Sequence, residues 1–342
     1  MTSESDGPSN NKNLKWAMGA VGVVAVLATV VAVVLLFGGG GSGAPKGAHP
    51  DEGSNPDAAA GVASVKDIGP VTVITEDSSC AAWTTINNEL STSGTGLWNE
   101  RDRSVPASAW TPKQRAQYIA AAQSMRGAAA QTVGLVKLTP HRVMRELYQQ
   151  FIAYARAYAE RVPKYTPADN NLAGAANSAS SALGAICAAI SDGPAGARGP
   201  LVQPSAPPSD IAPVGNPANP QPMLTTSNPV CEDWKSALDQ FGKNTAEWQK
   251  ADPNVPAIYW NHEQKAVNYA VAPVMNTYAS TLEQLGRQSD NAIWQDLANL
   301  SAQYRRAFVV ALPTYTPTDN HLANAANYVS TTILGACAAV GM

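Results

Sequence analysis

The chain has 342 residues, which is enough for two ordinary domains with linkers between them. Only 14% of the residues are charged and the formal net charge is −3. The sequence therefore lacks the basic field that nucleic-acid binding requires, and we expect no nucleic-acid partner. The acidic excess is too small to indicate a cationic partner.

The first feature along the chain is an uncharged apolar segment at 16–37. A helix over this segment would be about 33 Å long, which matches the apolar core of a bilayer. A cleaved signal peptide is the alternative, but the run is longer than a usual signal core and no clear cleavage site follows it. Lys12 and Lys15 precede the run. We therefore predict a single-pass cell-membrane anchor, with residues 1–15 cytoplasmic and the bulk of the chain extracytoplasmic.

Two segments have the composition of linkers. Residues 38–77 are rich in Gly, Pro, Ser and Ala and predict a flexible linker. Residues 193–227 contain nine prolines and predict an extended, semi-rigid linker. We interpret both as spacers.

The segments 78–192 and 228–342 are copies of each other. The stretch YTPADNNLAGAAN at 165–177 returns as YTPTDNHLANAAN at 315–327, with ten of thirteen residues identical. Each copy predicts four helices, and in the first copy these cover about 79–92, 112–136, 140–162 and 167–190. We therefore predict an all-α protein, in which the N-terminal transmembrane helix is followed by two tandem, duplicated four-helix up-down-up-down bundles.

The repeated stretch begins with a helix-start signal. Thr166 suits the N-cap position, Pro167 suits the first helical position, and Asp169 is placed to reach back to the cap. Thr316, Pro317 and Asp319 repeat the signal. We interpret this half of the repeat as helix initiation and not as a duplicated catalytic site.

Four cysteines divide equally between the copies. Cys80 and Cys231 begin the first helix of each copy, while Cys187 and Cys337 lie near the end of the fourth. In a bundle of four alternating helices these two points share one end. We therefore predict the disulfides Cys80–Cys187 and Cys231–Cys337, one of three possible pairings, which suits an extracytoplasmic location.

Two sets of residues are candidates for recognition. The asparagines recur at matched positions on the polar side of the fourth helix, where a solvated face, a tie to the loop before the second helix, or a recognition strip would each explain them; they are Asn170, Asn177, Asn320 and Asn327. The tryptophans flank the loop before the second helix, either as core or as the lining of an apolar pocket; they are Trp98, Trp110, Trp248 and Trp260.

The two copies differ in charge. Residues 78–192 contain 11 Lys and Arg against 7 Asp and Glu, whereas residues 228–342 contain 7 against 10. Part of the basic excess falls on the third helix of the first copy, at Arg142 and Arg145. These side chains could form a solvated face, dock the first copy on the second, or meet an anionic envelope polymer or headgroup.

No catalytic constellation is identifiable in the sequence. His262 and Glu263 begin a zinc-protease motif, but Ala266 stands where its second histidine would be. No Cys/His cluster has metal spacing, and phosphate-binding and dinucleotide motifs are absent. We therefore expect no cofactor, no metal and no enzymatic activity.

The order of a short polar start, a Val- and Ala-rich anchor, Gly/Pro linkers and an Ala-rich ectodomain resembles uncharacterised membrane-anchored envelope proteins of actinobacteria, including mycobacteria. We expect a non-enzymatic binding or scaffold protein of the cell envelope, with an envelope protein, lipid or cell-wall polymer as partner. The alternatives are a lipid- or small-molecule-binding accessory of envelope transport, and an extracytoplasmic enzyme of unknown reaction.

Overall fold

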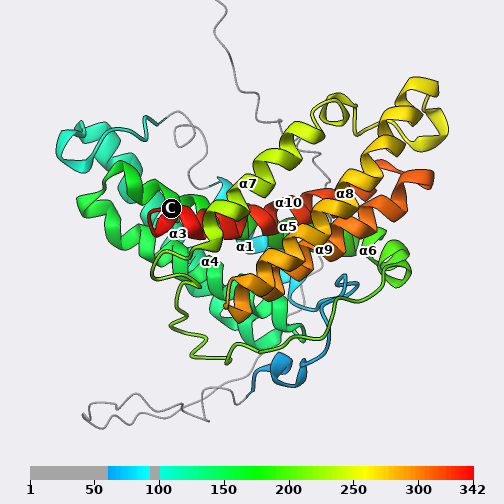
Figure 1. Ribbon diagram of the computed structural model, residues 1–342. Coiled ribbons are helices and arrows are strands. Elements are labelled where there is room, and N and C mark those ends of the chain that lie inside the picture. The colour runs from blue at the N-terminus through cyan, green and yellow to red at the C-terminus, as the bar shows by residue number, and fades with distance from the viewer. Residues whose placement is uncertain (1–60, 93–100) are drawn as a thin grey trace, which may run out of the picture. The chain divides into compact units, whose positions relative to one another are not determined.

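The computed structural model describes residues 61–92 and 101–342 (Figure 1). The predicted transmembrane helix at 16–37, most of the first linker and Trp98 lie outside the described residues. Within them the chain forms α-helices and short 3-10 helices and no strand, so the prediction of an all-α fold is confirmed. All described residues belong to one compact unit.

The helices of the second copy follow those of the first at a spacing of about 150 residues. The first repeat contains α1 (Cys80–Thr92), α3 (Pro112–Leu138), α4 (Arg142–Arg161) and α5 (Asn170–Ser191). The second contains α7 (Val230–Asn244), α8 (His262–Gln288), α9 (Ala292–Ala311) and α10 (Asn320–Ala339). A short helix, α6 (Pro194–Arg198), begins the segment between them.

Local side chains set where the long helices begin. The Thr111 hydroxyl accepts from the backbone N–H of Gln114, whose side chain accepts from the N–H of Thr111. Asn261 and Gln264 form the same capping box at the start of α8. Asp169 accepts from the Thr166 N–H at 2.7 Å as predicted, but the element that this cap starts is a 3-10 turn, and α5 follows it from Asn170.

The core of each repeat is aromatic and tightly filled. In the first repeat α3 packs along α4 and α4 along α5, while α1 lies against α3 and α5. Trp83 and its equivalent Trp234 are completely buried. The apolar stripe of α4 is buried along its length; it consists of Val143, Leu147, Phe151, Tyr154 and Tyr158, at steps of three and four residues. Much of the polar side of α4 is buried too, because α9 and the chain segment before α1 cover it.

The two repeats pack against each other through α5 and α10, which lie side by side in the middle of the unit (Figure 1). Asn171 near the start of α5 donates to the carbonyl of Ala338 near the end of α10, and Gly335 faces Ala175, so the helices run antiparallel. Small side chains let the two backbones approach closely. The segment 167–191 is long and apolar enough to cross a membrane, but most of its apolar stretch is buried inside the unit, where α5 packs against α10, α4 and α1.

The Pro-rich segment 193–227 lies against both repeats and does not hold them apart. Val71 and Ser205 exchange hydrogen bonds of 2.9 and 3.0 Å, which join this segment to the chain before α1. Met223 donates to the side chain of Gln150 on α4 at 2.7 Å. The composition does exclude a long helix here, but these contacts make the segment part of the packed unit.

Candidate functional site

The two disulfides join Cys80 to Cys187 and Cys231 to Cys337, which is the pairing that the repeat predicts. Each ties the first helix of a repeat to its fourth and spans 107 or 106 residues. In the chain-entropy description a loop of this length stabilises the folded state by about 4–5 kcal/mol. The cysteines are therefore structural, and all four described cysteines are paired.

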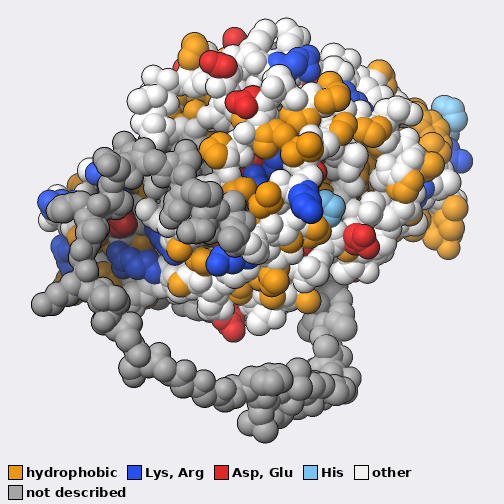
Figure 2. Space-filling view, turned by 90° about the horizontal axis from the view of Figure 1, so that it is seen from below, with side chains coloured by type: hydrophobic (Ala, Val, Ile, Leu, Met, Phe, Trp, Pro, Cys, Tyr) orange, Lys and Arg blue, Asp and Glu red, His pale blue; other side chains and the backbone are white. Residues whose placement is uncertain are grey.

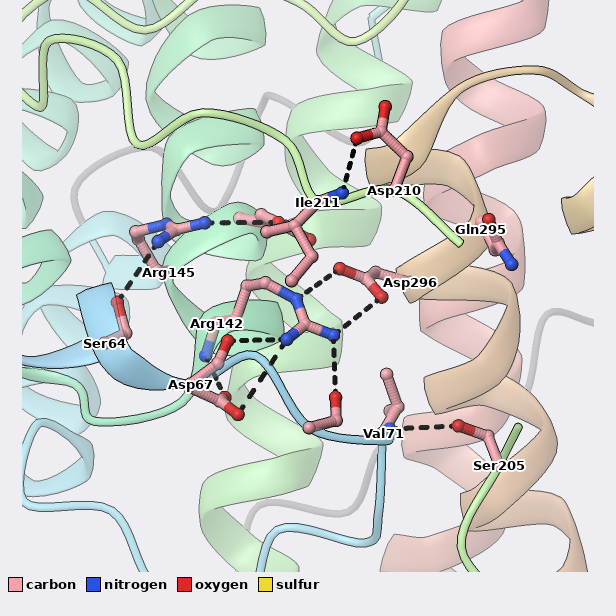
Figure 3. Close-up of polar contacts among 12 residues, drawn as sticks. Ser64, Asp67, Val71, Arg142, Arg145, Ser205, Asp210, Ile211, Gln295 and Asp296 are labelled. Carbon is pink, nitrogen blue, oxygen red and sulfur yellow. Dashed lines mark hydrogen bonds and ion pairs between the residues drawn. The ribbon is translucent and has the colours of Figure 1, made fainter. Parts of the chain in front are cut away.

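Arg142 lies at the junction between the repeats and not on an exposed basic face (Figure 3). Its guanidinium forms a two-point ion pair with Asp296 of α9, at 2.6 and 3.0 Å. It also donates to the carbonyls of Asp67 and Gly69 in the segment before α1. A single side chain thus ties together the first repeat, the second repeat and the N-terminal segment.

The two acidic residues at this junction are equivalents in the duplication. Glu146 of α4 and Asp296 of α9 are 150 residues apart, and both are completely buried. Burial, followed by the nearby charge of Asp296, raises the pKa of Glu146 well above its usual range. Arg145 pairs with Glu146 at 3.3 Å and approaches the Ser64 hydroxyl. Packing the repeats brings the two carboxyl groups close together, and both of the arginines that contact them, Arg142 and Arg145, come from the first repeat.

The recognition role considered for Arg142 and Arg145 is therefore corrected. Their side chains are about 2% exposed and cannot present charge to a polymer or headgroup. A neighbouring cavity of about 40 Å³ has room for about one water molecule. Figure 2 shows other Lys and Arg side chains scattered among uncharged ones on one face. The buried cluster acts as a clasp between the repeats.

The four candidate asparagines do not share one environment. Asn170 accepts from Arg101 at 2.9 Å, which ties it to the loop before α3. Asn327 accepts from Arg305, Asn177 is exposed and Asn320 is half-buried. Equivalent asparagines match in exposure, since Asn177 and Asn327 are both exposed and Asn170 and Asn320 are both half-buried, but their hydrogen bonds differ.

The candidate tryptophans pack as structural residues. Trp110 and Trp260 are buried, and their indoles donate to Val105 and Val255 at 2.9 and 2.8 Å. Trp248 is half-buried and donates to Asn268 at 3.1 Å. The contacts of Trp110, Trp248 and Trp260 therefore favour a role in the core over a role in lining a pocket.

Trp110 and Trp260 each stabilise a sharp corner at the end of a repeat. In the second repeat the Trp260 ring stacks on Tyr315, whose hydroxyl donates to Pro253 and whose carbonyl accepts from the Ala257 N–H at 2.9 Å. The first repeat has the same ring stack and the same backbone bond, made by Trp110, Tyr165 and Ala107. The corner is therefore one rigid device that occurs twice.

The side chains that the corner exposes differ between the repeats. Ile258 and Tyr259 are 79% and 72% exposed, and Tyr269, whose ring packs edge-on against Trp260, is 48% exposed. The equivalents in the first repeat are Ser108, Ala109 and Ile119. Tyr259 and Tyr269 are the large exposed aromatic residues of the described chain. We call Ile258, Tyr259 and Tyr269 the apolar corner.

Sequence reasoning missed the apolar corner because it looked for residues that the copies share. The sequence does show a difference between the copies at this point. Pro256 and Trp260 match Pro106 and Trp110, but the second copy has Ile and Tyr where the first has Ser and Ala. Large apolar side chains held outward on a fixed turn are typical of an interaction site.

The described residues contain no group of three or more His, Cys, Asp or Glu that could hold a metal ion. Glu146 and Asp296, whose burial is complete, pair with arginines and do not face a cleft. The described residues thus form two helical repeats joined by a buried ion pair, with the apolar corner exposed on the second repeat.

Known proteins share this sequence over most of its length. A family described as "Mycobacterial ESX-1 associated protein" matches residues 62–341, which includes both repeats and the segment before α1. An uncharacterised protein of Mycolicibacterium smegmatis (strain MKD8) is 45% identical over 347 residues, covering 98% of this chain and 89% of the relative. No solved structure matches the chain. The chain therefore belongs to the family of mycobacterial ESX-1 associated proteins.

Proposed function

We propose that the protein is a non-enzymatic binding or scaffold module of the cell envelope that acts in association with ESX-1. The family description supports the association. A membrane anchor at 16–37 and an extracytoplasmic location are part of the proposal, and the two disulfides support the location. The partner that we expect is an envelope protein; a lipid or cell-wall polymer is the alternative.

The observation that carries this proposal is the apolar corner. Exposing Ile258 and Tyr259 to water is unfavourable by roughly 1.5–3 kcal/mol for a large apolar side chain, relative to burying it against a partner. The turn is fixed by Trp260 and Tyr315 before any partner arrives, so little conformational entropy is lost on binding. Tyrosine is also among the residues that most often dominate protein interfaces.

A matched crosslinking experiment tests the proposal. A photo-crosslinking amino acid is placed at Tyr259 or, as the control, at the equivalent Ala109 in the full chain, expressed in Mycolicibacterium smegmatis. Both positions are exposed on the same kind of turn. We expect a discrete protein adduct at position 259 whose partner is missing at position 109. Equal adducts at both positions, or none at either, would remove the corner as the recognition site.

A second variant separates loss of binding from loss of fold. Ile258→Ser combined with Tyr259→Ala copies the Ser108–Ala109 corner of the first repeat, which the same backbone bonds support. The variant should keep the melting temperature and both disulfides while losing the crosslinked partner at a remaining probe on Tyr269. A partner retained by this variant would contradict the proposal.

A further inference from the structure

The second repeat contains a groove between α7 and α8 that is independent of the apolar corner. Its volume is about 370 Å³, within the range of roughly 300–1,000 Å³ that small-molecule sites occupy. The lining side chains are apolar or uncharged, and they include Phe241 from α7 and Pro273 and Tyr278 from α8. A ligand in this groove would therefore meet an apolar wall.

A buried cation lies behind the wall of the groove. The rings of Phe241 and Tyr278 are stacked, with centroids 4.1 Å apart. The Arg305 guanidinium of α9 lies 4.8 Å from the Phe241 ring centroid and 5.8 Å from that of Tyr278. Arg305 is completely buried, and burial lowers its pKa to about 10.

Arg305 has no carboxylate partner among the described residues. Its Nη2 donates to the side chain of Asn327, but Nε and Nη1 have no acceptor there. Three other arginines with little exposure each have a carboxylate partner; these pairs are Arg142–Asp296, Arg198–Asp319 and Arg306–Glu283. A buried charge without a partner of opposite charge destabilises the folded state, and a binding role would explain why Arg305 is kept there.

The fold does not need this cation. The equivalents of Arg305, Tyr278 and Phe241 in the first repeat are Ala155, Ala128 and Leu90. The first repeat therefore forms the same helices with an apolar residue in place of the guanidinium and without the stacked rings. Arg305 and its aromatic neighbours are specific to the second repeat.

We propose that the α7–α8 groove binds an amphiphile with an apolar chain and a terminal carboxylate, a ligand of the fatty-acid class. The chain lies along the apolar wall, and the carboxylate accepts from one of the two groups of Arg305 that have no acceptor, Nε or Nη1. Arg305 does not reach the wall of the groove in this state, so the half-buried Phe241 ring must change rotamer to admit the head group. The ligand then supplies the acceptor and the negative charge that the chain omits.

Photolabelling of the full chain in phosphatidylcholine nanodiscs tests this site. The probes are dodecanoate carrying a diazirine on its chain and dodecanol carrying the same group. We expect the acid to label α7 and α8 about tenfold or more efficiently than the alcohol, because a charge-assisted pair distinguishes them. Arg305→Ala should reduce acid labelling to the level of the alcohol, while the control Arg306→Ala, next to it on α9, should not.

Each possible result of the labelling experiment either supports or contradicts the proposed site. Equal labelling by acid and alcohol, or acid labelling unaffected by Arg305→Ala, would overturn the pairing with Arg305. Labelling outside α7 and α8 would overturn the site. Because Arg305→Ala copies Ala155, the unliganded variant should fold and keep both disulfides. Should it fail to fold, the wild-type chain still decides the matter: dodecanoate must raise its melting temperature with concentration and dodecanol must not.

Discussion

The ion pair between Arg142 and Asp296 gives the sharpest test of how the repeats are joined. Both side chains are about 1–2% exposed and they are linked at two points. Asp296→Asn keeps the volume but leaves the guanidinium with two carbonyls and the more distant, 32% exposed Asp67, 3.9 Å away. Removing one partner of a buried pair costs about 3–5 kcal/mol.

We expect the loss to fall near the lower end, about 3 kcal/mol. Burial raises the pKa of Glu146 most and the charge of Asp296 raises it next, so the substitution lowers the pKa of Glu146 and lets its carboxyl group offset part of the charge of Arg142. The measurement is urea unfolding of the oxidised full chain followed by tryptophan fluorescence, since Trp294 lies on the same helix as Asp296. A double-mutant cycle with Arg142→Met isolates the coupling between the two residues.

The control is Glu283→Gln, which removes the partner of Arg306. That pair is 26% and 16% exposed at its two side chains and lies within the second repeat, so its loss should cost less than about 1 kcal/mol. If Asp296→Asn costs no more than Glu283→Gln, the junction is not a clasp and the reasoning from burial fails.

Two further predictions concern the same contacts. Gly335→Ala should destabilise the protein by about 1–3 kcal/mol, because the added Cβ would lie 2.8 Å from the Ala175 Cα. Gly174→Ala has open space around the added Cβ and should stabilise the protein by about 0.5–1 kcal/mol. Thermal melts of both variants measure the two effects. Glu146→Gln should gain free energy of unfolding relative to wild type as pH rises above about 4.3, by up to 1.4 kcal/mol per pH unit. The reason is that folded wild type keeps a proton on Glu146 that the unfolded chain releases. Urea titrations at pH 4.5 and 7.5 that give the same difference between the two proteins would contradict this.

The sequence predicts best the features that depend on few residues. The cap predicted from Thr166 and Asp169 forms, and it starts the 3-10 turn that leads into α5. The disulfides follow from the duplication and the even number of helices in each repeat. The predicted helix at 140–162 lies within two residues of α4, because its apolar stripe is strictly periodic.

From the sequence, packing between the repeats was only one of three interpretations of Arg142 and Arg145. Arg142 occupies the polar side of an amphipathic helix, so its position predicts exposure, yet α9 and the segment at 67–69 cover that side. The composition of 193–227 predicts an extended chain, but not that Ser205 and Met223 bind along the repeats. Which surfaces meet is decided by shape complementarity over many residues, and no single motif encodes it.

The duplication itself explains where function is best sought. Two equivalent helices, α5 and α10, meet through small side chains, and the equivalent acids Glu146 and Asp296 are forced together beside them. Positions at this junction are constrained by both copies at once. The corner at Ile258 and Tyr259 and the cation at Arg305 lie on parts of the second repeat whose first-repeat equivalents are small or apolar. The first repeat folds without these side chains, so folding does not explain why the second repeat has them. A binding role would explain their presence.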